Sequence, residues 1–236
     1  MKRILNIVFA LVAIVLLSPL MLLVALILFL EDGQAPIYSS VRVGKNWHKF
    51  RIYKFRTMRK GADKMLLDLQ SMNSYVRVDE DRVPPIPSYF SLDYLYANNY
   101  RVREDVYLAE KHKCFEGTFI KIENDPRITR VGKILRKTSL DELPQLFNIL
   151  KGDMYLVGNR PLSVEEAELL TTNENAIRFQ ASAGLTGLWQ TDERKDDMPP
   201  SERIRLDNLY AEKESLAFDL QIIAATFKKI ISKGNV

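Results

Sequence analysis

The sequence predicts an α+β protein that is mainly helical, with an N-terminal re-entrant membrane helix broken at Ser18-Pro19, a small β-hairpin and interfacial amphipathic helices. Three observations predict this class. Residues 4–30 are almost all apolar, residues 36–56 alternate between apolar and polar side chains, and apolar residues recur at helical spacing in residues 127–150 and 216–231. We expect a membrane helix at residues 1–33 and a domain at residues 34–236 that carries an insertion at residues 71–118.

Composition narrows the chemistry that the chain can perform. Its 236 residues include 34 basic and 30 acidic side chains, for a net charge of +4. The single cysteine, Cys114, excludes an internal disulfide and a thiolate metal cage, and it points to a reducing compartment. Only two histidines, His48 and His112, are present, which argues against a histidine-rich zinc site. Carboxylates and arginines are the remaining candidates for chemistry.

The apolar N-terminal segment is long enough to enter a bilayer. As a helix, residues 4–30 would measure roughly 40 Å, more than the ~30 Å thickness of the hydrocarbon core. A cleaved signal peptide is the alternative, but its apolar region would be shorter and would end in a small-residue cleavage pattern that residues near the end of this segment do not form. We therefore expect a retained anchor.

The flanks of this segment indicate its path through the membrane. Lys2 and Arg3 precede it and nine basic residues follow between residues 42 and 64, so the positive-inside rule draws both ends to the cytoplasm. Pro19 removes a helical hydrogen bond, and Ser18 can satisfy the backbone group that is released. A re-entrant helix broken at Ser18-Pro19 satisfies both ends, whereas a kinked helix that still spans the membrane is the alternative.

Residues 35–58 predict a β-hairpin with a turn at residues 44–46. Its cations allow two interpretations: a basic surface lying on anionic lipid headgroups, or Lys54 and Arg56 directed at a phosphate. Spacing alone does not rank them. A short helix is expected at residues 61–70. The insertion that follows contains six of the ten tyrosines and is interpreted as a solvated excursion in preference to a lid or a dimer contact.

The stretch from Lys137 to Leu146 predicts a helix start. Ser139 is expected at the N-cap with Glu142 three residues later, which is the capping-box pattern, and Pro144 suits the first turn. Asp141 and Glu142 would then share the positive end of the helix dipole. Such a start is common in proteins, so it gains interest only from the cations upstream, which could seat a metal ion and a polyphosphate: Arg127, Arg130, Lys133, Arg136 and Lys137.

Three later features add to this pattern. Arg160, between Gly158-Asn159 and Pro161, is expected in a stiff loop suited to bidentate binding of phosphate or carboxylate. Ser201 is expected to cap a helix that runs to about residue 214. Residues 216–231 predict an amphipathic helix, which the pattern allows to lie equally well at a membrane interface or against the core.

Several strings carry a resemblance to a known family. They are IYKFRTM from residue 52, DPRITRVG from residue 125, SLDELPQLFN from residue 139, LKGDM from residue 150 and GLTGLWQ from residue 184, together with Ser18-Pro19 in the apolar segment. In this order they resemble the monotopic phosphoglycosyl transferases, bacterial enzymes that initiate glycan assembly on a polyprenyl phosphate. The resemblance covers most of the chain except residues 70–120.

The resemblance implies an enzyme of the bacterial inner membrane, with its domain on the cytoplasmic face, that moves a phosphosugar from a nucleotide sugar, expected to be a UDP-sugar, to a polyprenyl phosphate. It implies Asp141 as the nucleophile, forming a covalent aspartyl-phosphosugar, and Glu142 as its neighbour, with Mg²⁺ bound by both. No nucleic acid is expected as a partner, whereas membrane lipids and a homodimer are. The residues expected to contact substrate phosphates are Lys54, Arg56, Arg136, Arg160 and Arg194.

This chain departs from the family pattern at three places. Asn159 stands where the family often has the first proline of Pro-Arg-Pro, Ser182-Ala183 replaces an Arg-Pro pair, and Glu193-Arg194 replaces a glycine-arginine pair. These departures bear on sugar or nucleotide preference more than on reaction type. The alternative to an enzyme is a non-catalytic membrane-surface module that binds anionic lipid through its basic faces.

Overall fold

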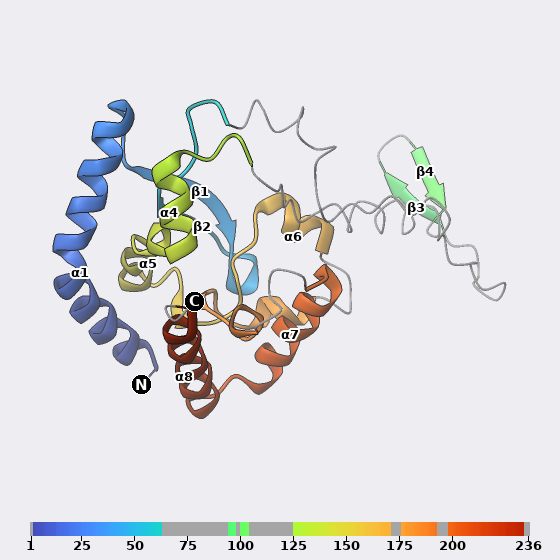
Figure 1. Ribbon diagram of the computed structural model, residues 1–236. Helices are drawn as coiled ribbons and strands as arrows, with labels where there is room; N and C mark the ends of the chain where they lie inside the picture. Colours follow the sequence, from blue (N-terminus) through green and yellow to red (C-terminus); the bar gives the residue numbers. More distant parts are fainter. Residues whose placement is uncertain are drawn as a thin grey trace.

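A computed structural model describes residues 2–62, 94–97, 100–103, 125–170, 176–192 and 198–233. Within these ranges the fold is mainly helical, as predicted (Figure 1). The α-helices are α1 (Lys2–Asp32), α4 (Arg130–Thr138), α5 (Gln145–Lys151), α6 (Val164–Leu170), α7 (Pro200–Lys213) and α8 (Leu216–Lys233). The 3-10 turns are η1 (Lys45–Trp47), η3 (Leu140–Glu142), η4 (Ala176–Gln180) and η5 (Trp189–Thr191).

The strands form three pairs. β1 (Ile37–Val43) and β2 (Lys49–Phe55) are antiparallel, which confirms the predicted hairpin, with Ile37 opposite Phe55 and Val43 opposite Lys49. β5 (Tyr155–Val157) and β6 (Gly184–Thr186) are parallel. In the insertion, the structure describes only the antiparallel pair β3 (Tyr94–Ala97) and β4 (Tyr100–Arg103). The helix predicted at residues 61–70 lies outside the described residues from residue 63 onward.

The β1–β2 hairpin lies at the centre of the fold because both of its faces are covered. Phe50 and Ile52 point to one face and are buried in a cluster with residues of α5 and with Ala10 of α1. Phe55 points to the opposite face and packs among Val24 and Leu28 of α1 and residues of α4. The two faces of β2 thus belong to two separate hydrophobic cores.

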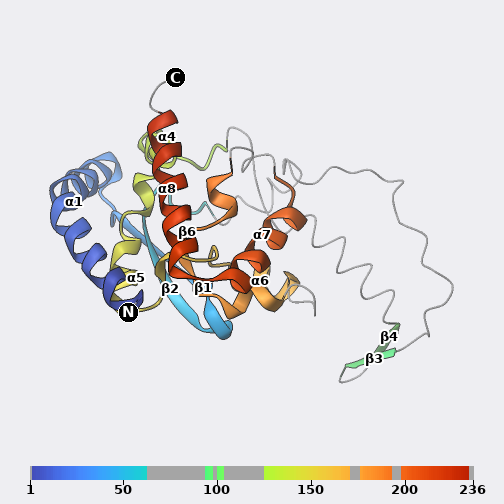
Figure 2. The ribbon, with the colours of Figure 1, turned by 90° about the horizontal axis from the view of Figure 1, so that it is seen from below.

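The apolar N-terminal segment forms a single helix of 31 residues, α1, which is long and apolar enough to cross a membrane. Helical backbone runs through Pro19, so the break predicted at Ser18-Pro19 is not observed. The helix curves along the side of the domain and does not separate into two (Figures 1 and 2). Pro19 has no N–H to donate to the Val15 carbonyl, and the Ser18 hydroxyl donates to that carbonyl instead, at 2.9 Å, as predicted.

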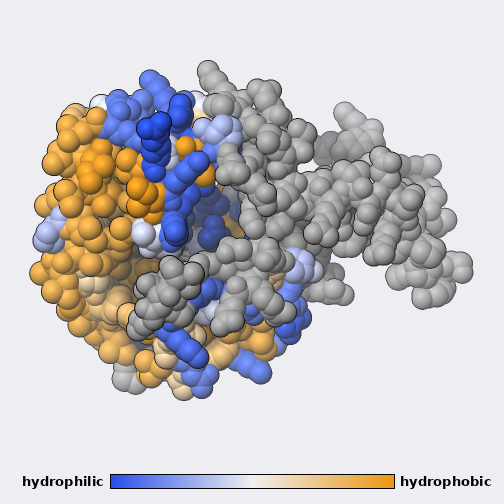
Figure 3. All heavy atoms as spheres, viewed as in Figure 1, coloured by the Kyte–Doolittle hydropathy of each residue, from blue (hydrophilic) through white to orange (hydrophobic). Residues whose placement is uncertain are grey.

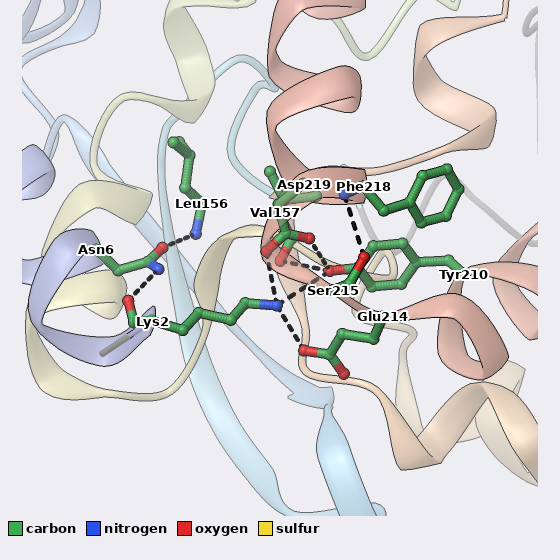
Figure 4. Close-up of polar contacts among 9 residues, drawn as sticks. All are labelled: Lys2, Asn6, Leu156, Val157, Tyr210, Glu214, Ser215, Phe218 and Asp219. Atoms are coloured by element: carbon green, nitrogen blue, oxygen red, sulfur yellow. Dashed lines mark hydrogen bonds and ion pairs between the residues drawn. The ribbon is translucent and has the colours of Figure 1, made fainter.

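Polar contacts fasten both ends of α1 to the same domain. At its N-terminus the Lys2 ammonium lies 2.8 Å from the Asp219 carboxylate and also contacts Glu214 and the Tyr210 hydroxyl (Figure 4). Arg3 donates to the carbonyls of Ile149 and Leu150, the last carbonyls of α5. At the other end, Arg56 Nη1 lies 2.7 Å from Asp32 Oδ2.

The outer side of α1 is apolar and exposed (Figure 3). Helix α8 has a dual character, since Ile222 and Asp219 are buried against the domain whereas Leu216, Leu220 and Phe227 are exposed. The position against the core is therefore confirmed for one side of α8, and the position of its other side at a membrane interface stays a prediction. The exposed large apolar side chains of α1 are Ile4, Leu5, Val8, Phe9, Leu11, Val12, Val15, Leu16, Leu22, Leu23, Leu26, Ile27, Phe29 and Leu30.

We expect Lys2→Ala to destabilise the docking of α1, because it leaves the buried Asp219 carboxylate without its ammonium partner. The loss of a hydrogen bond to a charged group of this kind costs about 1–3 kcal/mol. The thermal unfolding midpoint in detergent should fall, and Lys2→Arg should restore most of it. The matched control is Lys45→Ala at an exposed turn. Equal losses in Lys2→Ala and Lys45→Ala would contradict the assignment.

Candidate active site

The turn that carries Asp141 and Glu142 differs from the predicted capping box. Ser139 has left-handed backbone angles (φ 58°, ψ 17°) and ends α4, where its N–H bonds to the Arg136 carbonyl. An N-cap needs extended backbone, so a left-handed Ser139 cannot cap the next helix, and no side-chain cap is formed there. Residues 140–142 are the 3-10 turn η3, and α5 begins at Gln145. The predicted N-cap at Ser139 is therefore wrong by five residues, since the residue before α5 is Pro144.

The helix before this turn also begins later than predicted. Thr129 caps α4, with its side chain accepting from the Gly132 N–H at 2.9 Å, so the helix covers Arg130–Thr138 instead of residues 127–137. The preceding turn is closed by a buried ion pair in which the Arg127 guanidinium lies 2.7 Å from the Asp125 carboxylate. That pairing keeps residues 125–127 out of the helix.

Helix α4 packs very closely against the end of β2, and this sets the position of Arg136. A Cβ added at Gly132 would lie 2.2 Å from the Thr57 carbonyl oxygen, so only glycine fits this approach. One turn further along the helix, Arg136 Nε donates to the Thr57 hydroxyl at 2.9 Å. The arginine is thereby fixed beside the acidic turn.

Asp141 and Glu142 have different environments although they are adjacent. Asp141 is buried, with 8% of its surface exposed, whereas Glu142 is half-buried and its carboxylate lies 2.7 Å from the Lys54 ammonium. Burial raises the pKa of Asp141 above its ordinary 3.8, and the charge of Glu142 raises it further, while Lys54 and Arg136 lower it. The site therefore holds a desolvated carboxyl group whose negative charge is only partly balanced.

Glu142 and Lys54 line a small, open cleft. The cleft also includes Arg160, so three of the residues predicted to act on substrate meet there. It further contains Arg42, Gln145 and Gln190, which sequence reasoning missed. Strand alternation contained the signal for Arg42, because it stands opposite Phe50 and thus faces the same side of the hairpin as Lys54. Figure 3 shows hydrophilic surface directly beside the apolar surface of α1.

Two of the predicted phosphate-binding residues that the structure describes, Arg56 and Arg136, do not line this cleft. Arg56 donates to both Asp32 and Gln34 at the end of α1, so its guanidinium serves the helix attachment. Arg194 lies outside the described residues. Arg136 reaches the site from the side of Asp141 and is not among the cleft-lining residues.

The donors available to a metal are limited. Among the described residues no group of three or more His, Cys, Asp or Glu side chains is close enough to hold an ion. Asp141 and Glu142 can supply two carboxylates, and hard cations that keep water and phosphate ligands need no more from the protein. The mutual repulsion of these two carboxylates, visible in the raised pKa of Asp141, favours a cation beside them.

The sequence family decides what kind of protein this is. The bacterial sugar transferase family matches residues 1–233, almost the whole chain. The chain belongs to this family. Membership confirms the resemblance that the motifs carry and identifies the protein as a transferase, so the acidic turn and its cationic cleft are the candidate active site of a sugar transferase.

Several curated proteins are similar to the chain. It is 35% identical over 201 residues to the galactosyl transferase CpsE of Streptococcus agalactiae, covering 85% of this chain and 36% of CpsE. It is 34% identical over 235 residues to the exopolysaccharide production protein ExoY of Rhizobium meliloti, covering 99% of this chain and 87% of ExoY. It is also 34% identical to the undecaprenyl-phosphate galactose phosphotransferase of Salmonella typhimurium, of which it spans 41%.

We expect the charges around Asp141 to move its pKa in opposite directions when they are removed. Glu142→Gln should lower the pKa toward 3.8, because a repelling charge is lost, whereas Lys54→Met should raise it. Carboxyl ¹³C chemical shifts followed against pH, with the Asp141 signal assigned by Asp141→Asn, measure both. Lys45→Met, at the exposed turn, is the charge-matched control. Shifts of the same sign in Glu142→Gln and Lys54→Met would rule out this account.

Proposed function

We propose that this protein transfers a phosphosugar from a UDP-sugar to a polyprenyl phosphate through a covalent aspartyl-phosphosugar on Asp141. The observation that supports this most directly is a buried carboxyl group, adjacent to Glu142 of a cationic cleft, on which the charges of Lys54 and Arg136 act. Two relatives point the same way by name: the Salmonella galactose phosphotransferase, and the UDP-glucose:undecaprenyl-phosphate glucose-1-phosphate transferase of Caulobacter vibrioides, 32% identical over 240 residues.

In the first step the Asp141 carboxylate attacks the phosphorus that bears the sugar. The bond from that phosphorus to the bridging oxygen breaks, its electron pair stays on the bridging oxygen, and UMP leaves. A carboxylate approaching a diphosphate meets repulsion between anions, and the positive charges of Lys54 and Arg136 reduce this repulsion. Burial of Asp141 adds to its reactivity because the carboxylate gives up little hydration when it attacks.

In the second step a phosphate oxygen of the polyprenyl phosphate attacks the same phosphorus. The bond to the Asp141 oxygen breaks, the carboxylate is regenerated, and a polyprenyl-diphosphosugar is released. Splitting the transfer in this way keeps the two large phosphate substrates from having to occupy the site together.

Asp141 and Glu142 are the residues that would hold Mg²⁺, which when bound supplies positive charge to the phosphate oxygens. The pair fits this role because the charge of Glu142 raises the pKa of Asp141, and a cation beside the two carboxylates would relieve that repulsion. Glu142 contacts Lys54 at 2.7 Å. In this arrangement Glu142 would hold the Mg²⁺ ion to one side while Asp141 faces the phosphorus.

We propose that α1 enters and leaves the inner membrane on the cytoplasmic face. Lys2 at one end and Asp32 at the other are paired with side chains of one domain, which supports a helix whose two ends lie on one side. Its exposed apolar side would lie in the lipid next to the cleft. A polyprenyl phosphate could then present its headgroup to the site while its chain stays in the bilayer.

The central test is release of UMP from a UDP-sugar with no lipid acceptor present. Wild-type protein should release about one equivalent and retain the labelled sugar phosphate on the protein. Asp141→Asn should abolish both, since an amide oxygen is a poor nucleophile. Glu142→Gln and EDTA treatment should each lower the rate by about 100-fold or more if a metal bound there stabilises the transferring phosphoryl group.

The control for this test is Arg205→Ala, at an exposed ion pair on α7. It should leave UMP release unchanged. Full activity of Asp141→Asn would refute the proposed nucleophile. No UMP release from any UDP-sugar, together with lipid binding that EDTA does not change, would favour a membrane-surface module in place of an enzyme.

The path of α1 is tested by labelling residues at its two ends. In a Cys114→Ser background, Lys2→Cys and Lys60→Cys should both resist a membrane-impermeant thiol reagent in spheroplasts and both react after permeabilisation. A spanning helix would instead expose one of the two positions before permeabilisation.

A further inference from the structure

Arg42 lines the cleft, although by sequence it counts only among the basic residues that follow the membrane helix. It stands opposite Phe50 in the hairpin, so it shares a face with Ile52 and Lys54, and all three line the cleft. Lys54 stands opposite Tyr38, four residues from Arg42 along β1, which places the two cations about 13 Å apart at the backbone. The cleft therefore has one cation at the acidic turn and another at its far end.

Arg160 joins Arg42 at that far end. The Val43 N–H donates to the Leu162 carbonyl at 2.8 Å, which ties the loop of Arg160 to the end of β1. Arg178 donates to the Arg160 carbonyl at 3.1 Å, so the loop is also held from the other side. Both guanidinium groups line the cleft, and the charge of Arg160 is close enough to lower the pKa of Arg42, after the larger effect of burial.

Asn159, which stands where the family often has a proline, also helps to hold the loop of Arg160 in place. It is buried, and its amide donates to the Arg178 carbonyl at 2.9 Å and to the Asp207 carbonyl at 3.0 Å. Hydrogen bonds thus supply the rigidity that a proline would give to the backbone before Arg160. The departure from the family pattern preserves the position of the arginine.

The carboxylates near these two arginines lie outside the lining of the cleft. The Glu166 carboxylate lies 3.4 Å from the Arg42 guanidinium, and it is also bound by the Ser163 N–H at 2.6 Å in a capping box with Ser163. Glu165 also acts on Arg42, and Asp207 interacts with Arg160, but neither lines the cleft. The charged residues that line it are Arg42, Lys54, Arg160 and Glu142, so the lining carries net positive charge. Paired guanidinium groups of this kind suit a phosphate, which accepts bidentate hydrogen bonds.

The two steps of the proposed reaction constrain where such a phosphate must lie. In an in-line displacement the attacking and leaving oxygens lie on opposite sides of the phosphorus. UMP leaves on the side opposite Asp141, and in the second step Asp141 is the leaving group, so the lipid phosphate must attack from the side that UMP vacated. One location, across the cleft from the acidic turn, has to receive both phosphates in succession.

We propose that Arg42 and Arg160 form this shared phosphate site, which binds first the phosphate of the departing UMP and then the phosphate of the polyprenyl acceptor. The proposal rests on the proposed function and deepens it. It gives Arg42 a substrate-binding role and explains why the cations of the cleft are spread over its length instead of being gathered at Asp141.

The test starts from the covalent intermediate. Wild-type protein in nanodiscs is loaded with tritium-labelled UDP-glucose or UDP-galactose, freed of UMP by gel filtration, and divided. One portion receives UMP, which reverses the first step, and the other receives polyprenyl phosphate. Loss of label from the protein against acceptor concentration gives a half-saturating concentration for each. Arg42→Ala should raise both by about tenfold or more, as expected for lost charged hydrogen bonds.

Two further variants make the result specific. Arg42→Lys keeps the positive charge but cannot form bidentate hydrogen bonds, so it should raise the half-saturating concentration of both acceptors by less than Arg42→Ala does. Arg205→Ala should not change either concentration. Thermal unfolding midpoints identify any variant that fails to fold, in which case Arg42→Lys decides. A rise for only one acceptor, or for neither, overturns the shared site. If wild-type protein retains no label, it is the proposed function that fails, and not this inference alone.

Discussion

The attachment of both ends of α1 to one domain is the constraint on which the arrangement of the site depends. Lys2 reaches Asp219 and Glu214, Arg56 reaches Asp32, and between these contacts the helix packs on both cores of the hairpin. Because α1 packs against both faces of β2, and β2 also carries Lys54, the fold fixes the distance between the apolar surface and the cleft. A site built on this strand cannot move relative to the lipid-facing helix without disrupting the core.

Electrostatics in the acidic turn reflect a compromise between reactivity and stability. A buried carboxyl group beside a second carboxylate is costly, and Lys54 and Arg136 offset only part of that cost, since the pKa of Asp141 remains raised. Each cation is in turn held by the fold, Lys54 by Glu142 and Arg136 by the Thr57 hydroxyl. The charges are therefore in place before any substrate arrives, which is how preorganised sites lower a barrier.

Local pattern predicted much of the fold and failed where distant residues decide the outcome. Periodicity gave α1, the hairpin and the helices around residues 130–150, and Ser18 satisfies the carbonyl freed by Pro19 as its chemistry suggests. Ser139 matched a capping pattern, but the close approach of α4 to Thr57 and the reversal after it require a left-handed residue there. Pattern matching sees only the local sequence.

The candidate site shows the same division. The motif placed Asp141, Glu142 and Arg136 correctly together, because they are neighbours along the chain. Arg56 looked equivalent to Lys54 by spacing, yet its partner is Asp32, which no local rule identifies. Arg42 was hidden among many cations that the positive-inside rule already explained, and only the register of β1 against β2 separates it from them.

Asn6 carries a consequence for handling the protein. Its side-chain oxygen accepts the Leu156 N–H at 2.6 Å, so a polar residue of the apolar helix completes the outer edge of β5. Trimming α1 to obtain a water-soluble fragment would uncover that strand edge together with the apolar sides of two cores. Open edges of this kind recruit strands from other molecules. A truncated enzyme is thus a poor starting point for crystallisation, and lipid nanodiscs that retain the complete helix are the better preparation.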